Sequence, residues 1–179
     1  MILVPNDNWQ WNYDDKSDSL LLDLSDRMQF TTAYRGKLLT PQAKVSCQFT
    51  LDDASHYYHL LECIGELPFS EPERVQIVLN AVAAIRFAKP QMPQSWHFRE
   101  FNLLREAPLF GEVVTLVSTY GHQDFLVIEA GETASVCMLL NGSLQLSEDK
   151  ELQAHNYIKV MNNRIIPFAA VSSQLLRMA

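Results

Sequence analysis

The local structure of the chain is plainest in residues 70–90, which read SEPERVQIVLNAVAAIRFAKP. Ser70 and Glu73 are spaced as a capping box, and Pro72 stands in the first turn of the helix that would follow. Apolar residues then recur at helical spacing, at Val75, Val78, Leu79, Val82 and Ile85. Pro90 ends the pattern, because the residue before a proline disfavours the helical backbone. The stretch therefore predicts a long helix with an apolar stripe.

Upstream of this helix, the sequence predicts a shorter helix and several strands. Residues 52–64 begin with two aspartates, which suit a helix N-terminus, and Gly65 follows as a stop signal. Trp9, Trp11 and Tyr13 alternate with polar residues, as in a half-buried strand. Further strands are predicted at residues 20–24, 28–32 and 35–39, the first of them pairing as a hairpin with residues 9–13.

From about residue 100 onward the pattern is again β. Strands are predicted at residues 112–119, 125–129, 133–140, 158–160 and 165–168. Asn141-Gly142 is a hairpin signal, so residues 144–146 should pair back against the preceding strand. Short strands at this spacing indicate a small barrel or a strongly twisted sheet. The predicted class is α+β, with an N-terminal α/β part of strands plus two helices (residues 1–98) joined to a C-terminal β-barrel-like part (residues 99–179).

Composition limits the classes of function. The chain has 179 residues and a net charge of −7, which disfavours broad nucleic-acid binding because phosphates require a surplus of Lys and Arg. No run approaches the roughly 18 apolar residues of a membrane span. The N-terminus has no basic start and no long apolar stretch, so it is not a signal peptide. We therefore expect a cytoplasmic protein without membrane insertion, and its three widely spaced cysteines should be reduced, buried thiols.

The distribution of charge is more informative than the total. Residues 27–44 contain Arg27, Arg35, Lys37 and Lys44 and no acid. Residues 86–99 contain Arg86, Lys89 and Arg99 and no acid. Two such windows in an acidic protein predict local positive patches for an acidic partner, and chance clustering on solvated faces is the alternative.

Metal and catalytic motifs are poorly represented. His56, His59 and Cys63 lie near one face of the first predicted helix, but no second Cys/His pair and no H-E-x-x-H accompany them, so no metal site is predicted. The chain also lacks a G-x-S-x-G elbow and the glycine-rich phosphate loops. We predict no catalytic residue and no cofactor. The rival is a small enzyme or ligand-binding protein that uses a cleft between the two parts, where His56, His59 or His97 would meet a carboxylate.

The tryptophans divide into two cases. Trp9 and Trp11 lie on one face of their strand, where they are either core residues or exposed anchors for a partner. Trp96 is the better candidate for a binding surface, because its segment, residues 89–98, is basic and interrupted by prolines.

Several stretches resemble the ZapC family of cell-division proteins. They are DNWQWNYDD at 7–15, LLLDL at 20–24, KLLTP at 37–41, IKVMNNR at 158–164 and, most specifically, VLNAVAAIRFAKPQMPQSWHF at 78–98. The resemblance spans nearly the whole chain in order, and residues 42–76 and 99–125 match less well. It implies an N-terminal α/β part joined to a C-terminal β-barrel-like part.

The resemblance also implies a function. ZapC proteins are cytoplasmic accessory factors of the bacterial division ring that bind the tubulin-like GTPase FtsZ and promote lateral association of its filaments, without catalysis or a cofactor. A second lysine is expected in this family near the end of the KPQMP segment, where this chain has Gln94. Its absence implies weaker binding, or more reliance on Lys89 and Arg99.

The partner-binding hypothesis assigns six residues. Arg86, Lys89 and Arg99, with Trp96 as an apolar anchor, form the first predicted contact with FtsZ. Arg35 and Lys37 form a second patch. Because linking two filaments requires two contacts, either both patches bind or the protein self-associates.

Overall fold

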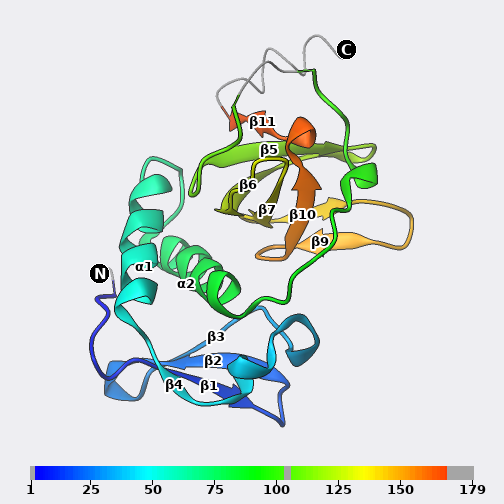
Figure 1. The fold of residues 1–179 in the computed structure, drawn as a ribbon. Helices are drawn as coiled ribbons and strands as arrows, with labels where there is room; N and C mark the ends of the chain where they lie inside the picture. Colours follow the sequence, from blue (N-terminus) through cyan, green and yellow to red (C-terminus); the bar gives the residue numbers. More distant parts are fainter. Residues whose placement is uncertain (1–2, 103–105, 169–179) are drawn as a thin grey trace. The chain divides into compact units, whose positions relative to one another are not determined.

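The computed structural model describes residues 3–102 and 106–168. The chain forms two compact units, residues 1–90 and 91–179, called here the N-terminal unit and the C-terminal unit. The first contains two α-helices and a small antiparallel sheet, and the second is rich in strands (Figure 1). The predicted α+β class is therefore confirmed.

The N-terminal sheet has four strands in the order β3-β2-β1-β4. They are β1 (Gln10–Asp14), β2 (Ser19–Asp23), β3 (Gln29–Thr31) and β4 (Cys47–Gln48). The predicted hairpin of β1 and β2 is present, with Trp11 opposite Leu22. Trp9 is 2 % exposed and Trp11 0 % exposed. Their interpretation as core residues is confirmed, and the alternative of exposed anchors is wrong.

Both helices begin with a capping box. In α1 (Leu51–Cys63), the Thr50 hydroxyl accepts a hydrogen bond from the Asp53 N–H, and the Asp53 carboxylate accepts one from the Thr50 N–H. In α2 (Glu71–Phe87), Ser70 and Glu73 make the same pair of bonds, as predicted. Each box satisfies N–H groups that the first turn of a helix leaves unpaired.

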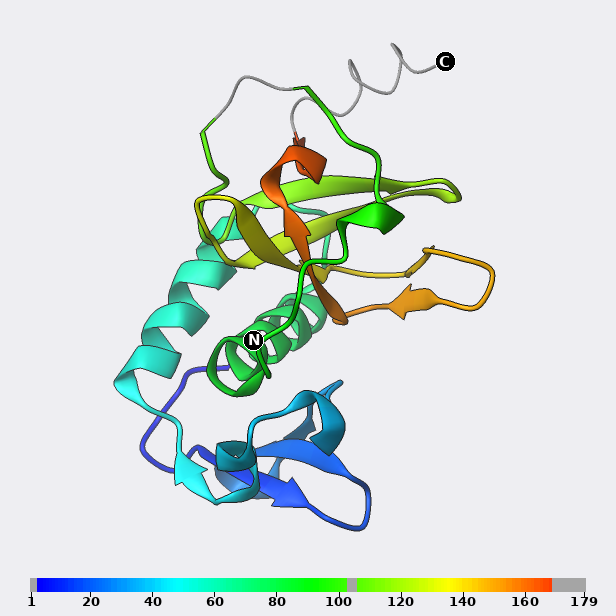
Figure 2. The same ribbon diagram turned by 45° about the vertical axis from the view of Figure 1, so that its right-hand side comes forward.

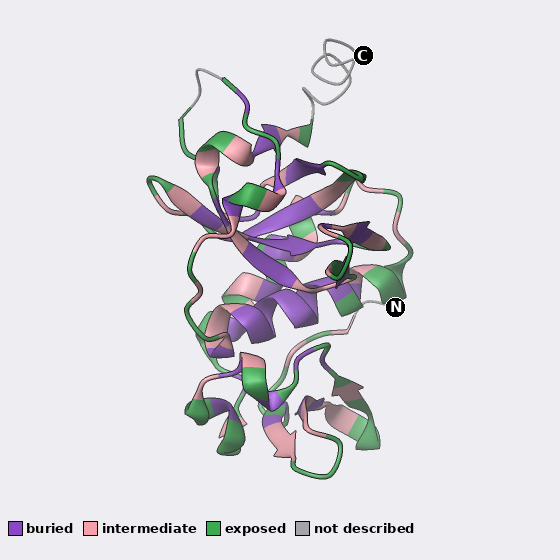
Figure 3. Cartoon of the chain, turned by 90° about the vertical axis from the view of Figure 1, so that its right-hand side faces the viewer, coloured by how far each residue is buried: buried purple, intermediate pink, exposed green. Residues whose placement is uncertain are grey.

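Helix α2 is buried around most of its circumference. Every residue from Ile77 to Ala84 is buried, as the purple ribbon of this helix shows (Figure 3). Asn80 lies among them, and its side-chain oxygen accepts a hydrogen bond from the Ala33 N–H at 2.8 Å while its amide donates to the Gln76 carbonyl at 2.9 Å. A helix that is apolar all round belongs to a core, so the predicted stripe understates its burial.

Residues 35–39 do not form the predicted strand. They contain the 3-10 turn η2 (Gly36–Leu38), which the second 3-10 turn η3 (Pro41–Lys44) follows. The Gly36 N–H donates to the Asp18 carboxylate at 3.0 Å instead of to a neighbouring strand. Leu39 then makes a single antiparallel bridge with Ala88. The Gly36 N–H is therefore satisfied by a side chain 18 positions away and not by a neighbouring strand.

The C-terminal unit is built on a five-stranded antiparallel sheet in the order β10-β7-β6-β5-β11 (Figure 2). Its strands are β5 (Val113–Ser118), β6 (Gly121–Glu129), β7 (Ala134–Leu139), β10 (Tyr157–Met161) and β11 (Ile166–Pro167). Buried side chains such as Phe125, Val127 and Leu139 form its core. Within the described residues the sheet is open, with β10 and β11 as its edges, rather than closed into a barrel.

The segment after Asn141-Gly142 turns away from the strand that precedes it. Strand β8 (Ser143–Gln145) pairs with β9 (Glu151–Gln153), and Leu144 lies opposite Leu152. The prediction that residues 144–146 pair back against residues 133–140 is wrong. Strand β7 already has β6 on one side and β10 on the other, so neither of its edges is free for β8.

The division between the units falls between Pro90 and Gln91, before the predicted boundary at residues 98 and 99. Residues 91–98 run beside the edge strand β10. The Gln94 N–H donates to the Lys159 carbonyl at 2.8 Å, and the Met161 N–H donates to the Ser95 hydroxyl at 2.8 Å. These bonds make the proline-rich segment part of the C-terminal unit.

Candidate functional site

Arg86 is held inside the N-terminal unit. Its guanidinium forms an ion pair with Asp53 and donates to the Gln48 carbonyl at 2.9 Å. The Arg86 side chain is 26 % exposed and the Asp53 side chain 4 %. Asp53 also accepts a hydrogen bond from the indole N–H of Trp11 at 3.1 Å. Arg86 therefore connects the end of α2 to the start of α1, and only part of it faces solvent.

Lys89 is exposed just beyond the end of α2. Its backbone N–H donates to the Leu38 carbonyl at 2.9 Å, and the Thr40 N–H donates to the Phe87 carbonyl at 2.7 Å. These two bonds flank the bridge between Leu39 and Ala88. The two basic windows of the sequence are thus joined by backbone hydrogen bonds, and Lys37 lies one residue from the bond that holds Lys89.

Arg35 and Lys37 are exposed on either side of the buried Gly36. Lys44 is exposed as well, and its ammonium lies 5.3 Å from the centre of the Tyr13 ring, within the range of a cation–π contact. The hydrogen bond from the Tyr13 hydroxyl lowers the pKa of the Asp18 carboxyl, and the Gly36 N–H and the charges of Arg35 and Lys44 act in the same direction. The same hydrogen bond raises the pKa of the Tyr13 hydroxyl.

Trp96 and Arg99 belong to the C-terminal unit. Trp96 is 73 % exposed on the 3-10 turn η4 (Ser95–His97), with its ring centre 5.4 Å from that of His97. Arg99 is exposed, and its N–H donates to the Val117 carbonyl at 2.8 Å. Burial lowers the pKa of His97, and the nearby charge of Lys150 lowers it further. The six candidates are thus divided, with Arg35, Lys37, Arg86 and Lys89 in one unit and Trp96 and Arg99 in the other.

Gln94 has a specific partner in this structure. Its side-chain oxygen accepts a hydrogen bond from the Lys150 ammonium. A lysine at position 94 could not accept this bond, because its side chain has only donors. Lys150 therefore brings a cation next to the position where the resemblance implies one. This pair could not be predicted from the sequence, because the two residues are 56 positions apart.

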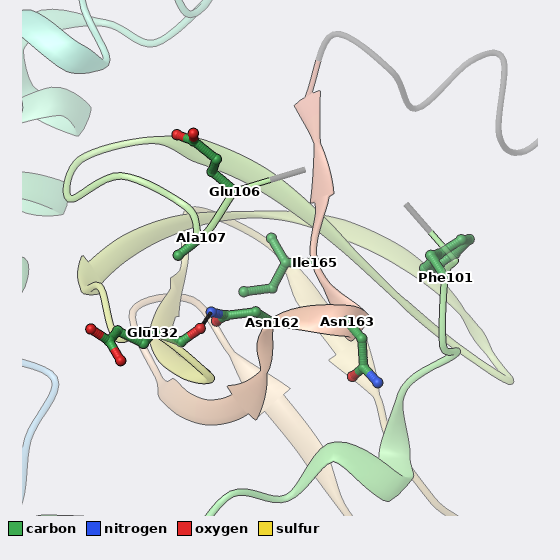
Figure 4. A pocket seen from close by; sticks show the side chains of 7 residues that line it. All are labelled: Phe101, Glu106, Ala107, Glu132, Asn162, Asn163 and Ile165. Atoms are coloured by element: carbon green, nitrogen blue, oxygen red, sulfur yellow. Dashed lines mark hydrogen bonds between the residues drawn. The ribbon is translucent and has the colours of Figure 1, made fainter. Parts of the chain in front are cut away.

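One pocket lies in the C-terminal unit and has a volume of about 190 Å³ (Figure 4). Its lining residues are Phe101, Glu106, Ala107, Glu132, Asn162, Asn163 and Ile165. Asn162 donates from its amide to the Gly131 carbonyl at 2.9 Å and to the Glu132 carbonyl at 3.1 Å. No histidine lines this pocket, and all of its lining residues belong to the C-terminal unit.

The described residues contain no group of three or more His, Cys, Asp and Glu side chains placed to hold a metal ion. His59 and Cys63 do meet, with 3.5 Å between the ring Nε2 and the sulfur. Burial raises the pKa of the Cys63 thiol, which disfavours the thiolate that metals and electrophiles require. In the part of the chain that the structure describes, no helix is both long and apolar enough to cross a bilayer.

Comparison with known proteins gives consistent results over the whole chain. The family model of the ZapC N-terminal part matches residues 2–89, and that of the ZapC C-terminal part matches residues 90–171. Cell division protein ZapC of Tolumonas auensis is 44 % identical over 179 residues, which is 100 % of both chains. The protein of that name from Aeromonas hydrophila is 48 % identical over 174 residues (97 % of each chain), and the one from Photobacterium profundum is 42 % identical over 168 residues (93 % of each).

Proposed function

The chain belongs to the ZapC family of cell-division proteins, and on that premise we propose that it binds FtsZ and promotes lateral association of FtsZ filaments. It acts in the cytoplasm, at the mid-cell division ring. Its role is to bind a protein polymer, with no catalytic residue and no cofactor.

The observation that carries this proposal is the joining of the two basic windows. The bridge between Leu39 and Ala88 places Arg35, Lys37 and Lys89 on connected backbone segments of one unit. All three side chains are exposed. We call these three residues the basic face. Arg86 does not belong to the basic face but helps to position it. Its ion pair with Asp53 fixes the C-terminal end of α2, and Lys89 lies just beyond that end.

Electrostatics explains why such a face suits a filament. FtsZ filaments are acidic, so neighbouring filaments repel each other. A cationic contact offsets that repulsion locally and increases the rate of encounter. The remaining surface keeps the protein at a net charge of −7, which favours solubility.

The C-terminal unit offers a second contact. Trp96 is 73 % exposed, and Met92 on the same proline-rich segment is 81 % exposed. Arg99, three positions after Trp96 in the chain, is exposed, and Gln94, two positions before it, accepts a hydrogen bond from Lys150. An exposed tryptophan on a segment that also carries an exposed arginine matches the composition of binding hot spots, in which Trp and Arg are enriched.

Lateral association requires that one molecule contact two filaments. The basic face and the Trp96 surface are carried by different units, so each can serve one contact. Self-association is the other way to reach two contacts. Either arrangement converts a weak single contact into a stronger double one.

Sedimentation of the protein with GTP-assembled FtsZ tests the proposal. Lys89→Asp should leave the fold intact and weaken binding by roughly fivefold, because an exposed cation becomes an anion facing an acidic filament. Arg27→Asp is the matched control. Arg27 is also an exposed cation of this unit, but it follows the C-terminal end of β2 and is not part of the basic face. If the Lys89 variant pellets as well as the wild type, Lys89 is not part of the contact.

A further inference from the structure

The loop of residues 35–38 carries two of the three cations of the basic face, and it is fastened at several points. At its start, Tyr34 is 0 % exposed and its carbonyl accepts the Leu20 N–H at 3.3 Å. At its end, Leu39 is 2 % exposed and bridges Ala88. Between these points, Gly36 is the residue whose N–H meets the Asp18 carboxylate at 3.0 Å. The Asp18 bond is thus the central attachment of the loop.

Asp18 is itself fixed by its surroundings. The Tyr13 hydroxyl donates to the same carboxylate oxygen that accepts the Gly36 N–H. The backbone of Asp18 is left-handed, with φ of 50°, at the end of the β1–β2 turn. A methyl group at Gly36 would overlap the Tyr13 hydroxyl and would lie 2.8 Å from the Asp18 oxygen. The Tyr13–Asp18 pair therefore leaves no room for a side chain at position 36.

The same three residues are surrounded by cations. Arg35 and Lys44 are both near enough for their charges to act on the Asp18 carboxyl. Lys44 also lies over the Tyr13 ring at 5.3 Å from its centre. The Asp18 carboxylate thus lies near two cations, and Asp15 is also near enough for its charge to help raise the pKa of the Tyr13 hydroxyl. What sets Asp18 apart is its geometry, because its carboxylate accepts hydrogen bonds from both the Tyr13 hydroxyl and the Gly36 N–H.

We propose that the Tyr13–Asp18 pair positions the cationic loop, so that Arg35 and Lys37 point outward together and Lys44 joins them as a further contact residue. This inference rests on the proposed function, and it adds the residues that shape the surface for an acidic filament. Asp18 and Tyr13 are positioning residues that do not touch the partner. Holding the loop in place reduces the ordering cost of binding, and this gain exceeds the loss of one unit of positive charge.

Two substitutions at one position separate geometry from charge. Asp18→Asn removes the negative charge and keeps an oxygen that accepts the Gly36 N–H. Asp18→Ala removes both. If positioning matters, Asp18→Ala should bind GTP-assembled FtsZ about fivefold more weakly than wild type, as expected for the loss of one charge-assisted hydrogen bond, whereas Asp18→Asn should bind at least as well as wild type. Asp26→Ala is the matched control, because Asp26 is another left-handed turn residue of this unit, with φ of 60°.

A second measurement on the free protein makes the test independent of the filament. In Asp18→Ala, the Gly36 amide should exchange with solvent at least tenfold faster than in Asp18→Asn, because its acceptor is lost. Equal or tighter FtsZ binding by Asp18→Ala, or unchanged exchange at Gly36, overturns the inference. The double variant Arg35→Ala/Lys37→Ala tests whether the basic face contacts FtsZ at all, independently of how its loop is positioned. If it binds like the wild type, the basic face itself, and with it the proposed mode of binding, is wrong.

Discussion

Loss of the buried Asp53 carboxylate should destabilise the N-terminal unit more than loss of any of its exposed charges. Asp53 is 4 % exposed in its side chain and meets three donors, from Trp11, Thr50 and Arg86. In Asp53→Ala, the fully buried Trp11 indole N–H loses its acceptor, which costs about 1–3 kcal/mol. Loss of the capping box adds about 1 kcal/mol.

The broken ion pair with Arg86 adds a smaller amount. A buried pair costs about 3–5 kcal/mol when one partner is removed, but Arg86 is 26 % exposed, so water partly replaces the carboxylate. We therefore expect a total destabilisation of about 3–4 kcal/mol in the free energy of unfolding. Asp52→Ala is the matched control, because Asp52 is exposed in the same first turn of α1 and should change stability by less than about 0.5 kcal/mol.

Urea unfolding followed by tryptophan fluorescence measures this effect. Trp9 and Trp11 are buried in the N-terminal unit, and their emission should report its unfolding, whereas Trp96 is already exposed. The Asp53→Ala transition should move to lower urea with an unchanged slope. A loss below about 1 kcal/mol would show that the three hydrogen bonds do not stabilise the fold as the geometry indicates.

Three further predictions concern binding and pH. FtsZ bundling should weaken as salt rises above physiological strength, because exposed charges are screened over about 8 Å there; turbidity that is unchanged by salt would indicate apolar contacts instead. Trp96→Ala should weaken FtsZ sedimentation without lowering the melting temperature, because the ring is 73 % exposed, whereas Trp11→Ala should cost about 3–5 kcal/mol in unfolding free energy. Burial lowers the pKa of His155 in the fold, so the unfolded chain binds the proton more readily, and stability should fall as the pH drops below about 6.5. His155→Asn, which suits the left-handed φ of 70°, should flatten that pH dependence in thermal melts, and an equally steep curve would rule out His155 as its source.

Much of the fold was readable because local signals are strong in this chain. The capping box at Ser70, the proline at position 90 and the alternation around Trp11 each act over a few residues, and each prediction was confirmed. The errors have a different origin. Residues 35–39 were predicted as a strand, but the Asp18 carboxylate accepts the Gly36 N–H. Residues 144–146 follow a good hairpin turn, but both edges of β7 are already paired.

The candidate surface shows the same division. The acid-free windows around Lys37 and Lys89 are visible in the sequence, as is the basic, proline-interrupted segment that made Trp96 the better candidate for a binding surface. The ion pair that restrains Arg86 and the bond from Lys150 to Gln94 are not visible there. Each joins residues that are far apart in the chain, and a single sequence has no periodicity that would indicate such pairs.

The sequence by itself determined the two helices, most of the strands, the positive windows in an acidic chain and the resemblance to a family, because these depend on residue type and short-range spacing. Only the tertiary structure decided that Leu39 meets Ala88 and that Asp18 holds Gly36. The physical reason is that contacts between residues far apart in the chain depend on which buried hydrogen-bonding groups pair in the folded protein. It was such pairing that brought the backbone of Lys89 next to that of Leu38.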